Sequence, residues 1–337
     1  MGGTFVIRGA RVYRHEGDTE MPQIGDVLVR DGVIAAVLDD VGDENAEVID
    51  LAGQLLMPGY INGHYHSHDV LAKGLFEVMP LERWGIVAGA IGNNRSLEEV
   101  RLRTLVGAIE CARNGITTIQ DFANLAKFDP DYIDAMVDAY ESVGVRVILS
   151  TTVRDKSQLE TILWADEMVP EAQHEIIGTG AGDGLAQVAF VGEQIDRIGD
   201  RGGRVIWGIS PSAPQRCSFE LLEKVAHFAR ERTVPVYTHV YETRLQRLFA
   251  RERLAAYGGS AVGFMEAAGL VGPHVTIAHG VWPNDEEIKR LSDSGTGVVL
   301  NMLSNLRLRS GVAPLTAYRR AGVALSLGCD NCSCSDF

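Results

Sequence analysis

The sequence lacks the features by which membrane-spanning and exported proteins are usually recognised. No apolar run approaches the length of about 18 residues that a membrane-spanning helix needs. No basic segment followed by an apolar stretch stands at the N-terminus, so we expect no signal peptide. The five cysteines are few and odd in number, which fits a reducing compartment better than a disulfide framework. We therefore expect a cytoplasmic protein with no membrane partner.

Positive charge is also scarce. Lys and Arg total 31 against 45 Asp and Glu, which gives a formal net charge of −14 at pH 7. Phosphate-binding signatures are missing too, because no G-x-x-x-x-G-K-[ST] occurs and the glycine-rich residues 178–184 do not match G-x-G-x-x-G. An acidic surface disfavours nucleic acid as a partner. We therefore expect no nucleic-acid partner.

What the sequence does contain is a regular alternation of strands and helices after a short β-rich start. Residues 4–55 have the pattern of short strands, with an Asp-Gly hairpin signal at 31–32. The expected helices are at 97–113, 131–143, 185–199, 218–232, 284–294 and 313–321. The expected later strands are at 55–62, 116–122, 145–152, 204–210, 235–241, 275–282, 297–303 and 323–329.

This alternation predicts the fold class. Eight strands separated by helices over roughly 250 residues are typical of an α/β fold, the parallel (β/α)8 TIM barrel. A doubly wound sheet is the alternative architecture. A chain of 337 residues accommodates one such domain and a smaller one. We place a small N-terminal β-sandwich-like domain at residues 1–55 and the barrel at residues 56–337.

The first candidate for chemistry is the segment 57–69, MPGYINGHYHSHD. The Pro-Gly pair before His64 and His66 argues for a strand end rather than a helix. Side chains at i and i+2 of a strand lie on the same face, so the two imidazoles can point at one metal ion. Two solvated histidines on a strand are the alternative, and H-x-H alone is a weak signal.

Further candidates lie at later strand ends. In a barrel of this kind the active site is at the C-terminal ends of the strands. His239 and Glu242 fall at the end of one strand, His279 at the end of the next, and Asp330 after the last. Any one of these histidines is more commonly an ordinary core or surface residue. Four histidines and an aspartate at the same rim are much harder to explain in that way.

With these residues in place the chain resembles a known family. Residues 57–66, 238–242 (THVYE), 278–282 (AHGVW), 304–314 and 327–330 (LGCD) are similar to motifs of the amidohydrolase superfamily. The similarity is to the branch of cytosine, guanine and S-adenosylhomocysteine deaminases and triazine hydrolases. The resemblance implies that one divalent metal is held by His64, His66, His239 and Asp330. It also implies that Glu242 and His279 work on the substrate.

The implied chemistry suits these residue types. Three imidazoles and a carboxylate are suitable ligands for Zn²⁺, with Fe²⁺ as the alternative, and such a metal makes hydroxide available near neutral pH. Asp330 can take a proton from the water, Glu242 can protonate a ring nitrogen and the leaving group, and His279 can polarise the attacked carbon or orient the nucleophile. We expect an aminohydrolase that releases ammonia from a small amino-substituted N-heterocycle. The alternatives are dechlorination of a triazine-like ring and a non-catalytic barrel protein.

The lysines bear on the number of metal ions. A binuclear site in this superfamily usually needs a carboxylated lysine on the fourth strand. None of the five lysines, Lys73, Lys127, Lys156, Lys224 and Lys289, lies in or at the end of the strand expected at 204–210. A mononuclear site is therefore expected.

Three residues are weaker candidates for contacts with substrate. His68 follows the histidine pair, Trp84 lies in a segment that resembles one over the substrate in the family, and Gln215 follows the fourth strand. A solvated loop residue and an ordinary packed tryptophan are equally good explanations for His68 and Trp84, and Gln215 could read a ring amide. Ser212 stands where many family members have histidine or arginine, so the substrate itself stays open.

The C-terminal region holds the last expectations. Cys329, Cys332 and Cys334 are interpreted as small packing residues near the metal rather than as a metal knuckle. The chain ends seven residues after Asp330, whereas family members continue. We therefore expect a barrel without its last helix, less stable than a longer form, and an open edge that favours a homo-oligomer.

Overall fold

The computed structural model describes residues 3–14, 20–42, 46–76, 78–92, 95–157, 159–164, 167, 170–171 and 182–332. Most of the glycine-rich segment 178–184, together with Cys334, lies outside the described residues. The chain forms two compact units, Met1–Gly59 and Tyr60–Phe337. Each unit is described by itself.

The first unit is built on one five-stranded sheet. Its strands are β1 (Thr4–Val12), β2 (Gln23–Arg30), β3 (Val33–Leu38), β4 (Glu47–Asp50) and β5 (Leu55–Leu56). They run in the order β3-β2-β1-β4, and β5 also pairs with β1. The predicted hairpin joins β2 to β3 through Asp31 and Gly32, which have φ angles of 50° and 78°. Two positive φ angles suit a tight two-residue hairpin turn, which is why Asp-Gly was an informative signal.

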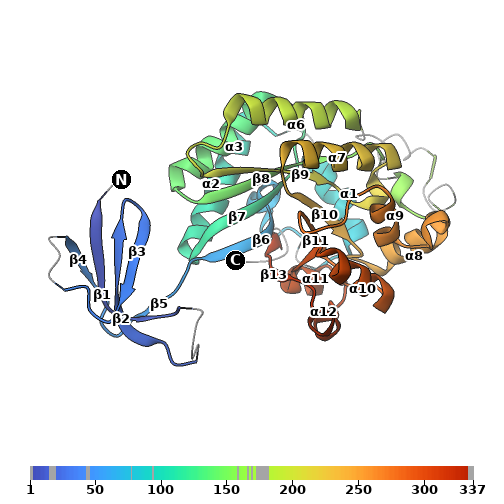
Figure 1. Cartoon of the computed structure of the whole chain (residues 1–337). Coiled ribbons are helices and arrows are strands. Elements are labelled where there is room, and N and C mark those ends of the chain that lie inside the picture. The colour runs from blue at the N-terminus through green and yellow to red at the C-terminus, as the bar shows by residue number, and fades with distance from the viewer. Residues whose placement is uncertain are drawn as a thin grey trace. The chain divides into compact units, whose positions relative to one another are not determined.

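The second unit is a closed parallel barrel (Figure 1), which confirms the predicted fold class. Its strands are β6 (Tyr60–His66), β7 (Ile116–Ala123), β8 (Arg146–Val153), β9 (Val205–Pro211), β10 (Val236–Val240), β11 (Val275–His279), β12 (Gly297–Leu300), β13 (Leu325–Leu327) and β14 (Asp330–Asn331). They run in the order β13-β12-β11-β10-β9-β8-β7-β6-β14. Only two residues separate β13, which pairs with β12, from β14, which pairs with β6. These two short strands therefore act as one divided eighth strand that closes the barrel.

Helices connect these strands and cover the outside of the barrel. They are α1 (Leu81–Gly92), α2 (Leu97–Arg113), α3 (Pro130–Val143), α6 (Gly184–Ile198), α7 (Phe219–Arg232), α8 (Arg244–Arg253), α9 (Ala261–Ala267), α10 (Asp285–Ser294), α11 (Met302–Arg307) and α12 (Leu315–Ala321). The side chain of Ser96 accepts a hydrogen bond from the backbone N–H of Glu99 and so caps the start of α2. Gly144 ends α3 in the left-handed conformation. Local caps of this kind are why the helix boundaries lay close to the prediction.

Two strand predictions were wrong in extent. The segment 55–62 was expected to be one strand, but Pro58 and Gly59 divide it into β5, in the first unit, and β6, in the second. The strand expected at 297–303 ends at Leu300, and α11 begins at Met302. An apolar run alone does not reveal where sheet pairing stops, and here the pairing of β12 with β13 ends at Leu300.

The main hydrophobic core belongs to the second unit. It contains fully buried side chains from the strands, such as Ile119 and Leu149, and from the covering helices, such as Leu221 and Tyr318. The core holds the strands rigidly, so polar side chains at their C-terminal ends are well placed for a site. In the described part of the chain, no helix is both long and apolar enough to cross a membrane.

Candidate active site

The site begins at the end of β6, where His64 and His66 share one face of the strand. Both side chains are almost completely buried. The Nε2 atom of each imidazole lies 3.2 Å from Oδ1 of Asp330, which comes from the neighbouring strand β14. The i, i+2 spacing thus directs both rings at one carboxylate, as the strand geometry predicted.

His239 completes the group from across the barrel. It lies on β10, and its Nε2 is 3.3 Å from Nε2 of His66. One ligand atom from each of His64, His66, His239 and Asp330 falls within 4.8 Å of the others. Ligand atoms about 2.0–2.1 Å from one zinc ion lie roughly 3 Å apart. The separations of 3.2–3.3 Å among these atoms therefore fit ligands of one shared metal ion, which for catalysis would also need an open position for water.

The far ring nitrogens orient these imidazoles. Nδ1 of His66 lies 2.9 Å from the carbonyl oxygen of Phe122, and Nδ1 of His239 lies 2.6 Å from that of Ser212. A carbonyl only accepts, so each Nδ1 carries the proton and each Nε2 keeps its lone pair for a metal. The buried Nε2 of His64 lies beside the carboxylate of Asp330 but makes no well-directed hydrogen bond among the described residues. A buried polar atom without such a bond is costly, and a metal ion would satisfy it.

The electrostatics also favour neutral imidazoles beside an ionised carboxylate. Burial lowers the pKa of His64 to about 4 and lowers the pKa of His239 well below its ordinary value. Burial alone would raise the pKa of Asp330. The nearby histidines, of which His279 has the largest effect, instead hold this pKa well below its usual range. The pKa of His66 is raised, because its contact with Asp330 outweighs the effect of burial. Metal binding would displace that proton, since a ligand must offer a lone pair.

A second group faces this one. Nε2 of His279, at the end of β11, lies 3.6 Å from Oε2 of Glu242 and 3.9 Å from Oδ2 of Asp330. Nδ1 of His279 is 2.8 Å from the side-chain oxygen of Asn305. Burial, and then the charge of Asp330, raises the pKa of Glu242 well above its ordinary value. A cation beside Glu242 would favour its carboxylate and act against that shift.

The backbone is strained where it aims these side chains. His279 and Asp330 have φ angles of 73° and 65°, and Tyr241, between His239 and Glu242, has 53°. Residues other than glycine rarely adopt this left-handed conformation, which costs about 1–3 kcal/mol each. Such strain persists only where the surrounding structure enforces it, and it concentrates at functional sites.

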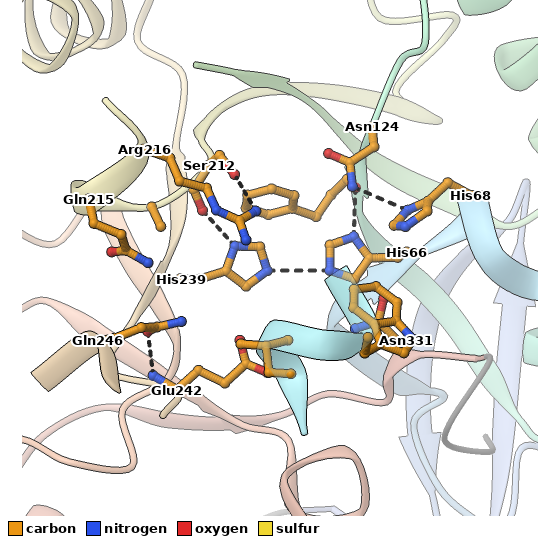
Figure 2. A pocket seen from close by; sticks show the side chains of 14 residues that line it. His66, His68, Asn124, Ser212, Gln215, Arg216, His239, Glu242, Gln246 and Asn331 are labelled. Atoms are coloured by element: carbon orange, nitrogen blue, oxygen red, sulfur yellow. Dashed lines mark hydrogen bonds between the residues drawn. The ribbon is translucent and has the colours of Figure 1, made fainter. Parts of the chain in front are cut away.

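A pocket opens beside His66 and His239, two of the metal-ligand candidates (Figure 2). The three expected substrate-contact residues, His68, Trp84 and Gln215, all line it. The sequence reasoning missed four polar residues that also line the pocket: Asn124, Arg216, Gln246 and Asn331. Asn124 directly follows β7, so the strand-end rule applied to every strand would have found it.

The C-terminal cysteines have packing roles in the described residues. Cys332 is buried in the main core, and Cys329 packs against that core. The backbone N–H of Cys332 donates to Oδ1 of Asp69.

Comparison with known protein sequences gives the same family as the motifs. Residues 55–337 match the amidohydrolase family profile. The chain is 29% identical over 332 residues to a 5'-deoxyadenosine deaminase from Methanosarcina barkeri, covering 98% of this chain and 69% of that protein. It is 31% identical over 336 residues to a 5-methylthioadenosine/S-adenosylhomocysteine deaminase from Symbiobacterium thermophilum, covering 98% of this chain and 70% of that protein. The chain is also 31% identical over 310 residues to a 5-methylthioadenosine/S-adenosylhomocysteine deaminase from Pyrococcus furiosus, and it covers 66% of the length of that protein. The chain thus spans about two thirds of the length of these relatives.

Solved structures share the fold. An atrazine chlorohydrolase from Arthrobacter aurescens, solved with zinc, superposes with a TM-score of 0.81 at 22% identity, covering 99% of this chain and 74% of that one. A guanine deaminase from C. acetobutylicum superposes with a TM-score of 0.79 at 19% identity, covering 98% of this chain and 76% of that one. These similarities support the barrel and its N-terminal sheet. Together with the profile match over most of the chain, they establish that the protein belongs to the amidohydrolase family.

Proposed function

We propose that this protein is a metal-dependent deaminase that removes an amino group from an adenosine-like N-heterocycle by hydrolysis and releases ammonia. The observation that carries the proposal is the ligand group of His64, His66, His239 and Asp330, which Glu242 and His279 face, beside a pocket that His66, His239 and Glu242 line. The relatives named for deamination of 5'-deoxyadenosine and 5-methylthioadenosine support the leaving group and the kind of ring. The substrate is therefore expected to be a small heterocycle.

The donor set supports a single zinc ion. Three imidazole nitrogens and one carboxylate oxygen would suit zinc, with iron as the alternative. When bound, such an ion supplies a hydroxide nucleophile near neutral pH. The described part of β9 and of the turn after it contributes no lysine, so a second, bridged ion has no ligand there.

The chain's own residues then manage the protons. Asp330, ionised and buried, is placed to accept a proton at the carboxylate oxygen that faces His279. Glu242, beside Nε2 of His279, is placed to deliver a proton to a ring nitrogen and then to the departing amine. His279 offers an unprotonated Nε2 if Asn305 holds the proton on Nδ1, so it is suited to orient the attacking water.

The test is a substrate and metal assay on the purified protein. Ammonia release is measured from adenosine-type nucleosides, guanine, cytosine, pterins and aminotriazines, and chloride release from chlorotriazines, after loading with Zn²⁺ or Fe²⁺. The proposal predicts about one bound metal per chain and ammonia from an adenosine-type nucleoside. Chloride release without deamination would instead support the dechlorinating alternative. A chain that binds no metal would support the non-catalytic one.

A further inference from the structure

The pocket contains a cation that the deamination mechanism does not use. Arg216 is the last residue of the short 3₁₀ helix Pro214–Arg216, which follows β9. Its backbone is held on both sides, because its N–H donates to Ala213 and its carbonyl accepts from Lys156. Its side chain lines the pocket together with Ser212 and Gln215 (Figure 2). The position of this charge is therefore well defined.

The guanidinium is poorly satisfied. Of its five N–H groups, one makes a long hydrogen bond of 3.4 Å to Oγ of Ser212. The Nε atom is fully buried and has no hydrogen-bond partner among the described residues. Burial lowers the pKa of Arg216 to about 10, so the group stays charged at neutral pH. An unpaired buried charge costs several kcal/mol, which a partner would offset.

No described carboxylate lies within 4.0 Å of Arg216 to neutralise it. Glu242 and Glu82 are near enough to favour its charged form, but Glu242 faces His279 and Glu82 accepts a hydrogen bond from Thr243. A second guanidinium, that of Arg154, is near enough to oppose the charge of Arg216. The side chain of Arg154 is itself in no described ion pair or hydrogen bond. Two guanidinium groups therefore lie near this wall of the pocket, and neither is paired with a described carboxylate.

We infer that Arg216 binds an anionic substituent of the substrate, a carboxylate or a phosphate, while Arg154 adds to the positive potential. A planar guanidinium matches both groups by forming two parallel charge-assisted hydrogen bonds. The inference rests on the proposed deaminase function and narrows its substrate class to amino-heterocycles that carry a negative charge away from the amino group. The metal end of the pocket would take the amino-bearing ring and the Arg216 wall the anion.

The first test is a comparison of reaction rates. Deamination of 5'-deoxyadenosine is compared with that of adenosine 5'-carboxylic acid and adenosine 5'-monophosphate, which separates a carboxylate from a phosphate. The parent protein should prefer one of the anionic substrates. The Arg216→Gln variant should lose about 10- to 100-fold in kcat/KM for that substrate and change little for 5'-deoxyadenosine. Arg251→Gln, on the exposed face of α8, controls for the loss of one positive charge. An equal loss on neutral and anionic substrates would overturn the inference.

A binding measurement keeps this test separate from the proposed function. Purine riboside 5'-monophosphate, purine riboside 5'-carboxylate and neutral purine riboside have no amino group to lose and are titrated calorimetrically into the zinc-loaded protein. Preferred binding of an anionic riboside that disappears in Arg216→Gln supports the inference even if no substrate turns over. Arg154→Gln should give a smaller loss, because Arg154 acts at longer range. Equal affinity of parent and Arg216→Gln for the anionic ribosides would refute the inference, and unchanged thermal unfolding of the variants would show that their fold is intact.

Discussion

Each histidine at the site is prepared for its role by what its two ring nitrogens contact. In His66 and His239, one nitrogen donates to a backbone carbonyl and the other faces the ligand group. Exposed His227, by contrast, lies on α7 beside Glu231. Identical side chains thus differ in function because the backbone fixes the tautomer only at the buried positions.

The ligand set can be tested directly. His64→Ala or His239→Ala should abolish both bound metal and activity, because each removes one of the four proposed ligands. The matched control is His227→Ala, which removes an exposed imidazole and should leave both unchanged. The measurement is elemental analysis together with the ammonia assay. Full metal content and full activity in His64→Ala would show that the ligand set is wrong.

Glu242 is separable from the metal. Glu242→Gln keeps the shape of the side chain but cannot exchange a proton, so metal content should persist while turnover falls about 10²–10⁴-fold. Glu252→Gln, on the exposed surface of α8, serves as the control. Turnover equal to that of the parent would reduce Glu242 to a structural role.

At the scale of elements, one buried carboxylate joins several segments behind the site. Glu287, near the start of α10, accepts hydrogen bonds from Tyr241, Arg247 and the backbone N–H of Asn284. Ser260, the N-cap of α9, donates to it as well. Because Tyr241 lies between His239 and Glu242, this network holds the strained turn that aims both of them.

Loss of this carboxylate should therefore weaken the whole unit. Glu287→Gln is expected to lower the free energy of unfolding by about 3 kcal/mol, because it removes the negative charge from a buried ion pair with Arg247. Glu286→Gln, one residue earlier and 70% exposed, should change it by less than about 0.5 kcal/mol. Urea unfolding measures both. Similar midpoints for the two variants would mean that the network contributes nothing measurable.

At the scale of the whole barrel, the proposed ligands come from the first, fifth and last strands, β6, β10 and β14. A bound metal would link these strands across the barrel and beside its closing seam. Binding to the folded state alone stabilises a protein by mass action, by about 2.7 kcal/mol at a free metal concentration of one hundred times Kd.

Metal removal should accordingly lower the melting temperature. We expect a chelator to reduce it by several degrees and added Zn²⁺ to restore it, as measured by thermal unfolding followed by circular dichroism. His64→Ala should unfold at the same temperature with and without chelator. An equal response to chelator in this variant and the parent would place the metal elsewhere.

Much of the site was predictable because its signals are local. The i, i+2 spacing of His64 and His66 and the strand ends at His239 and His279 each depend on backbone geometry over a few residues. The strand-end rule also gave Glu242 and Asp330, and the family motifs supplied the roles expected of them. The confirmed barrel followed from the alternation of strand and helix periods.

The environment of Arg216 was not predictable from the sequence. Its position next to Gln215 was visible in the sequence, but its missing counter-ion was not, because an ion pair depends on segments that are distant in the chain. The division of the last strand around residues 328–329 was equally hidden, because sheet pairing is decided between strands.

The sequence by itself determined the family, the kinds of element and the residues able to bind a metal, because periodicity, capping and ligand chemistry are properties of short segments. Only the tertiary structure decided that His66 and His239, 173 residues apart, bring their Nε2 atoms within 3.3 Å. It likewise decided that the chain divides at Tyr60 and that an unpaired guanidinium faces the pocket. Burial and charge balance arise from long-range packing, and they exist only once the barrel has closed.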